Sequence, residues 1–103
     1  MLAHPYNITV NSRASLGENN TLFKGCTIGS IRSGKREGVP VIGDRVAIMM
    51  NATVCGNIKI GNDVLIAANS FVDFDVPDNS VVIGSPGVIH YKEKASKDYM
   101  TGL

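Results

Sequence analysis

The 103-residue sequence is poor in charge, cysteine and histidine, and it contains no tryptophan. Charged residues make up only 18% of the chain, which is low for a compact domain and predicts that a partner chain covers part of the surface. The net charge of +1 gives no electrostatic reason to expect nucleic acid or an acidic membrane as a partner. Two cysteines, Cys26 and Cys55, are too few for a disulfide framework or a zinc site, so free thiols and no metal are expected.

The sequence also lacks long apolar runs and a leader. No stretch approaches the length of a membrane span, and residues 1–9 lack the basic start and apolar core of a signal peptide. Free thiols are typical of a reducing compartment, so a cytoplasmic protein is expected. The length predicts one small domain, and a hydrophobic content of 44% is enough to form its core.

Aliphatic residues recur at every sixth position along most of the chain. This period matches neither the 3.6 residues of a helix nor the alternation of a strand. The positions are Val10, Leu16, Leu22 and Ile28, and then Ile42, Ile48, Val54, Ile60, Ile66 and Val72. One step before Val10 lies His4. The gap between Ile28 and Ile42 is eight residues longer than one step, and the glycine-rich, basic segment Ser30–Pro40 is expected to be an extruded loop.

Three six-residue steps per turn explain this pattern. Each step would be a short strand followed by a tight corner, and each strand would stack on the strand 18 residues away. Gly, Asn and Asp, which follow the aliphatic residues, tolerate the left-handed backbone angles that corners need. Three inward columns are expected: His4, Leu22, Ile48 and Ile66; Val10, Ile28, Val54 and Val72; and Leu16, Ile42 and Ile60. An ordinary β-sandwich is the alternative, and it would require the regular spacing to arise by chance.

The same phase assigns directions to other side chains. The residue four places after each aliphatic is small or aliphatic and is expected to point inward: Ala14, Cys26, Val46, Ala52, Ile58, Val64, Ser70 and Val76. Cys26 should therefore be buried, whereas Cys55 directly follows an inward position and should face outward. The helix is expected to span residues 1–89 in about four coils, with a polar tail at residues 90–103.

The segment IGDRVAIMMNATVCGNIKIGNDVLIAANSFVDFDVPDNSVVIGSPGVI, Ile42 to Ile89, resembles the hexapeptide-repeat acyltransferases, and in particular the serine acetyltransferase branch. The resemblance extends back to Met1 and implies an all-β, left-handed parallel β-helix. It also implies a homotrimer with active sites between chains, with the Ser30–Pro40 loop reaching towards a neighbour. Acetyl-CoA would be the co-substrate and a small-molecule alcohol the acceptor, either a sugar hydroxyl or a hydroxy amino acid such as serine. The helical N-terminal domain of the family is expected to be lacking.

The chemistry of acetyl transfer to an alcohol needs a base, and His4 and His90 are the only histidines. By spacing alone, His4 is equally well the first residue of an end coil. The resemblance implies that His4 is the catalytic base, because HPYNITVNSRASLG matches the catalytic stretch of the family. Two positions depart from the family pattern: Ala3 replaces an Asp, and Val39 replaces a His. Both losses argue against serine held in the usual way.

The resemblance places coenzyme A along the outside of the coils, against small residues. Ala67 and Ala68 keep the small pattern, whereas Met50 does not, and a flexible methionine either lines the cofactor groove or blocks it. Val88 stands where the family has a lysine, so Lys92 or Lys94 would have to replace it.

Two functions from different classes are therefore open. One is an acetyl-CoA-dependent O-acetyltransferase, and the other is a truncated, non-catalytic β-helix that serves as an assembly or binding module. A metal enzyme of the carbonic anhydrase type on the same fold needs three histidine ligands, and the chain has two.

Overall fold

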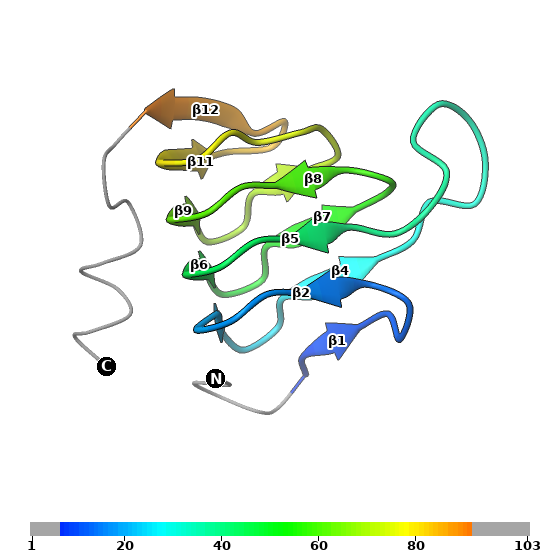
Figure 1. The fold of residues 1–103 in the computed structure, drawn as a ribbon, viewed down its shortest axis with the longest axis horizontal. Helices are drawn as coiled ribbons and strands as arrows, with labels where there is room; N and C mark the ends of the chain where they lie inside the picture. Colours follow the sequence, from blue (N-terminus) through cyan, green and yellow to red (C-terminus); the bar gives the residue numbers. More distant parts are fainter. Residues whose placement is uncertain (1–6, 92–103) are drawn as a thin grey trace.

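The computed structural model describes residues 7–91, which form a left-handed parallel β-helix of about four coils (Figure 1). Twelve short strands run along this part of the chain. They are β1 Thr9–Val10, β2 Ser15–Leu16, β3 Thr21–Leu22, β4 Thr27–Gly29, β5 Val41–Ile42, β6 Val46–Ile48, β7 Thr53–Cys55, β8 Lys59–Ile60, β9 Val64–Ile66, β10 Phe71–Val72, β11 Ser80–Ile83 and β12 Val88–Tyr91. No α-helix occurs within residues 7–91, and accordingly none there is long and apolar enough to cross a membrane.

The strands form three sheets, one on each face of the coil. Their orders are β1-β4-β7-β10, β12-β11-β9-β6-β3 and β2-β5-β8, so consecutive strands always belong to different sheets until β11 and β12. Each sheet is built from parallel pairs of strands from successive coils, as in Val54 of β7 opposite Val72 of β10. The predicted stacking distance of 18 residues is therefore confirmed.

The three predicted columns of inward side chains are also confirmed by the register. One column runs Leu22, Ile48, Ile66 and then Val82; the second runs Val10, Ile28, Val54 and Val72; the third runs Leu16, Ile42, Ile60 and then Val76. The residues four places on, from Cys26 to Val76, lie in the same buried cluster. Each fully buried aliphatic side chain contributes roughly 1.5–3 kcal/mol, so these columns are the main source of stability.

The first described coil departs from this pattern. Val10 is 37% exposed and Leu16 is 40% exposed, whereas Ile28 and Ile42, one coil further on, are at most 2% exposed. Within residues 7–91, β1 and β2 pair with a strand on one side only. A side chain in a coil is buried by the coils on both sides of it, so a residue with one neighbouring coil keeps part of its surface open.

The segment between β4 and β5 projects from the side of the coil (Figure 1). Ile31 and Gly38 exchange two backbone hydrogen bonds, with N–O distances of 3.0 and 2.9 Å, so the segment is a short hairpin. Because it adds eight residues, Ile28 pairs with Val54, 26 residues away, and the register of the coils is otherwise unchanged.

The last coil ends in a change of strand direction. Strand β12 pairs antiparallel with β11, with Val82 opposite Ile89 and Ser80 opposite Tyr91. The regular pairing therefore runs two residues past Ile89, the position at which the sequence analysis placed the end of the helix.

Candidate functional site

The residues assigned to coenzyme A lie together at one corner of the coil. This corner, residues 23–26, 49–52 and 67–70, connects the sheet of β3, β6 and β9 with the sheet of β4, β7 and β10. The N–H of Asn69 donates to the carbonyl oxygen of Met50 at 3.0 Å, which places Met50 and Ala68 on adjacent coils. Both asparagines of the corner, Asn51 and Asn69, have left-handed backbone angles, with φ of 61° and 62°.

The corner presents a small, mainly apolar surface. Met50 is 44% exposed, Ala68 is exposed and Ala67 is half-buried. Met49 turns the other way and packs against Ala47 and Leu65. Residues of this kind offer van der Waals contact and backbone polar groups, which suits the pantetheine arm of a cofactor and supplies no acid or base.

The proposed base lies outside the described residues. His4, Ala3, Lys92 and Lys94 all fall in residues 1–6 or 92–103, so no contact joins any of them to the corner. The second histidine, His90, is exposed on β12 opposite Val81.

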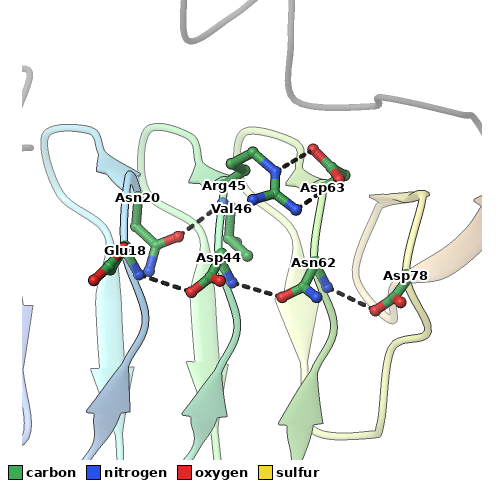
Figure 2. Close-up of polar contacts among 8 residues, drawn as sticks. All are labelled: Glu18, Asn20, Asp44, Arg45, Val46, Asn62, Asp63 and Asp78. Atoms are coloured by element: carbon green, nitrogen blue, oxygen red, sulfur yellow. Dashed lines mark hydrogen bonds and ion pairs between the residues drawn. The ribbon is translucent and has the colours of Figure 1, made fainter.

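A ladder of polar side chains follows a second corner (Figure 2). The N–H of Glu18 donates to Asp44 Oδ1 at 2.9 Å, the N–H of Asp44 donates to Asn62 Oδ1 at 2.8 Å, and the N–H of Asn62 donates to Asp78 Oδ1 at 2.7 Å. Each link joins one coil to the next. The sequence analysis assigned these positions to corners, and it missed that their side chains bond the neighbouring coil.

The same corner explains the recurring glycines. A Cβ atom at Gly17, Gly43 or Gly61 would collide with the ladder oxygen of the next coil, which is Asp44 Oδ1, Asn62 Oδ1 or Asp78 Oδ1. The glycine is therefore needed for close approach of a side chain, and these three glycines have no positive φ. Beside the ladder, Arg45 Nε lies 3.0 Å from Asp63 Oδ1, and the hydrogen bond from Arg45 to this carboxylate raises the pKa of the guanidinium.

The two thiols do not differ as predicted. Cys26 is fully buried, as expected, but the prediction that Cys55 is exposed is wrong, because Cys55 is only 9% exposed. Cys55 is not part of the main core cluster, which is consistent with an outward direction. The hairpin lies against the end of β7, since a Cβ on the adjacent Gly56 would be 2.8 Å from both Arg36 O and Ile31 Cδ1. Burial raises the pKa of both thiols, and the charge of Asp73 adds to the rise at Cys55.

No metal centre is evident in the described part of the chain. Residues 7–91 contain no group of three histidine, cysteine, aspartate or glutamate side chains arranged to hold an ion. The carboxylates of the ladder are instead occupied by backbone N–H groups.

Comparison with known proteins places this coil among transferases. The model of the bacterial transferase hexapeptide family (six repeats) matches residues 40–73. A serine acetyltransferase of Staphylococcus aureus is 40% identical over 86 residues, which is 84% of this chain and 40% of that protein. The chain thus spans about 40% of the length of this curated relative. The resemblance indicated by the sequence is confirmed.

Solved structures agree with the sequence match. The crystal structure of a Neisseria gonorrhoeae serine acetyltransferase superposes with a TM-score of 0.80 at 39% identity, covering 90% of this chain and 36% of that one. A serine acetyltransferase in complex with CoA superposes with a TM-score of 0.78 at 29% identity, covering 87% of this chain and 36% of that one.

Proposed function

We propose that this chain, which carries the hexapeptide-repeat β-helix of serine acetyltransferases, is an acetyl-CoA-dependent O-acetyltransferase. The acceptor would be a sugar hydroxyl or a small hydroxy amino acid such as serine. The observation that supports it most is the shared fold at 39% identity over 90% of the chain. The free thiols, both buried, accord with a cytoplasmic location.

His4 would act as the general base. Its imidazole would take the proton of the acceptor hydroxyl while the oxygen attacks the carbonyl carbon of the thioester. The carbon–sulfur bond then breaks, and coenzyme A leaves as the thiol. General-base catalysis contributes typically ~10²–10⁴-fold, so His4→Ala should lose at least 100-fold in rate while coenzyme A still binds.

The corner of Met50, Ala67 and Ala68 would hold the cofactor. The exposed Met50 and Ala68 sit on adjacent coils, where an extended pantetheine arm could lie across both. If Met50 lines this surface, Met50→Ala should weaken coenzyme A binding; if it crowds the surface, the change should tighten it.

Calorimetry with coenzyme A tests this proposal. Ala68→Trp adds bulk at the exposed corner and should abolish binding, whereas Ser33→Trp adds the same bulk in the exposed hairpin and should leave binding unchanged. Equal effects of the two changes would remove the corner as the cofactor site.

A homotrimer is the proposed assembly, with the active site between chains and the hairpin towards a neighbour. Val41 and Phe71 are exposed on two different faces of the coil, and the low charge content leaves apolar surface for contact between copies. Light scattering should report three chains per particle at micromolar concentration, and a monodisperse monomer would contradict the assembly.

The alternative is a non-catalytic β-helix that serves as an assembly or binding module. It is favoured by Val39, which stands where the resemblance implies a histidine, and by the bulk of Met50 at the proposed cofactor corner. No detectable coenzyme A binding by the parent chain or by Met50→Ala would support this module over the enzyme.

A further inference from the structure

A pocket of about 500 Å³ lies between the first described coil and the hairpin. It shares no residue with the corner of Met50, Ala67 and Ala68. Its lining residues are Asn11, Arg13, Ser30, Ile31, Arg32, Glu37 and Gly38. Two segments that are separate in the sequence thus form one concave surface, which is the usual shape of a small-molecule site.

The charges of the pocket are unbalanced. Arg13 and Arg32 bring two guanidinium groups, and Glu37 brings one carboxylate. The ion pairs found within residues 7–91 are Arg36 with Asp75 and Arg45 with Asp63, so neither lining arginine has a carboxylate within ion-pair distance there. The pocket therefore carries a net charge of about +1 and has unused guanidinium donors.

Backbone contacts hold both arginines in place. The N–H of Arg13 donates to Asn11 Oδ1 at 2.9 Å, which fixes the turn in the first coil. On the other side, the N–H of Asn57 donates to the carbonyl oxygen of Arg36 at 2.8 Å, and this contact fastens the hairpin to a later coil. The Ile31–Gly38 pair closes the hairpin directly beside Arg32. The two guanidinium groups are thus presented from anchored backbone.

We propose that this pocket binds a small monocarboxylate, with Arg13 and Arg32 pairing with the carboxylate group. Guanidinium groups match the planar geometry of a carboxylate and donate to both of its oxygens. Glu37 opposes a second negative charge, so a monoanion fits the pocket better than a phosphate dianion. This site does not rest on the proposed acetyl transfer, because its residues and its ligand chemistry are independent of coenzyme A.

Glycerate, a hydroxy monocarboxylate, is a suitable probe, with glycerol as its neutral counterpart and inorganic phosphate as the dianion. Titration followed by NMR should show glycerate binding, no binding of glycerol and weaker binding of phosphate. A hydrogen bond to a charged group contributes about 1.5–3 kcal/mol, so Arg13→Ala and Arg32→Ala should each weaken glycerate binding by about tenfold. Lysine at either position should restore part of the affinity.

Two further variants sharpen the test. Lys24→Ala removes one exposed positive charge outside the pocket and should leave glycerate binding unchanged. Glu37→Gln removes the opposing charge and should raise phosphate affinity more than glycerate affinity. Arg13, Arg32 and Glu37 are exposed, so these variants should melt like the parent, which circular dichroism can check.

Equal binding of glycerate and glycerol, tighter binding of phosphate than of glycerate, or equal losses in Lys24→Ala and Arg32→Ala would overturn the proposal. Adding acetyl-CoA then identifies the source of the carboxylate. Acetylated glycerate would make it part of the acceptor, and bound but unmodified glycerate would make it a separate ligand; both results uphold the pocket. Failure to bind coenzyme A would count against the proposed enzyme alone.

Discussion

The carboxylate of Asp44 accepts a hydrogen bond from the backbone N–H of Glu18 at 2.9 Å, across 26 residues of sequence (Figure 2). The backbone N–H of Asp44 in turn donates to Asn62 in the next coil. One residue therefore satisfies a corner in the coil before it and is satisfied by the coil after it. This relay ties neighbouring coils together at a place where the strands themselves have ended.

Removing one link of the ladder should lower stability without changing the fold. Asp44→Ala leaves the N–H of Glu18 without its acceptor, and a hydrogen bond of this kind contributes about 0.5–1.5 kcal/mol. For a domain of this size the melting temperature should fall by roughly 4–8 °C for each kcal/mol lost. Asp44→Asn keeps an acceptor oxygen and should melt close to the parent in differential scanning calorimetry. Equal losses in both variants would show that charge, and not the acceptor, matters here.

The ladder also dictates where glycine is needed. In Gly43→Ala the new Cβ would collide with Asn62 Oδ1 and lie 2.8 Å from the carbonyl oxygen of Gly61. Overpacking of this kind costs typically 1–3 kcal/mol. Gly29→Ala is the matched control, because its Cβ would meet nothing closer than Thr27 Cγ2 at 3.7 Å. Urea denaturation should show a lower midpoint for Gly43→Ala and a midpoint at or above the parent for Gly29→Ala; the reverse order would contradict the close-approach argument.

Both thiols should react slowly in the native protein, and Cys26 more slowly than Cys55. Cys26 is 0% exposed and Cys55 is 9% exposed. Burial raises the pKa of both thiols, so each has less of the reactive thiolate at neutral pH than an exposed cysteine. Ile31→Ala removes the side chain that lies near Gly56 and should accelerate labelling of Cys55 by Ellman's reagent but not that of Cys26. Equal acceleration of both thiols would mean that the variant had loosened the whole coil.

The raised thiol pKa values also predict a loss of stability at alkaline pH. An unfolded cysteine titrates near ~8.5, whereas the folded thiols keep their protons to higher pH. The folded state therefore binds more protons in this window, and the free energy of unfolding falls as pH rises through it. Below pH ~8 the two states are equally protonated at these groups and the contribution is constant. A chain with both cysteines changed to alanine should show a shallower decline between pH 8 and 10 by chemical denaturation, and an unchanged slope would contradict the assignment.

Arg45 carries a conflict between its backbone and its charge. It has a left-handed φ of 56°, an unusual angle for arginine, while it pairs with Asp63. The equivalent corner positions, Asn19 and Asn79, are asparagines, which adopt such angles more readily. In Arg45→Asn the lost ion pair opposes the backbone gain at low salt, and salt screens only the ion pair. The melting temperature relative to the parent should therefore rise with salt concentration. Arg45→Gln removes the charge without the backbone gain and should stay below Arg45→Asn at every salt concentration.

The six-residue period was sufficient to predict the coil, its three columns and the register of Leu22, Ile48 and Ile66. A repeated pattern places equivalent side chains one above another, so local sequence spacing determines which residues share the core. The burial of Val10 and Leu16 was predicted less well, because burial depends on how many neighbouring coils a residue has. The proposed base His4 lies outside the described residues, and its role stays a prediction.

The sequence by itself determined the repeat, the inward positions and the place of the hairpin, because each of these follows from spacing along the chain. The tertiary structure alone decided that the hairpin lies beside Cys55, that Asp44 bonds Glu18, and that Arg13 and Arg32 line one pocket. Each of these relations joins residues 18 or more positions apart whose side chains point away from the core. The hydrophobic period carries information about the inside of the coil, and outward contacts depend on how the corners and the hairpin stack in space.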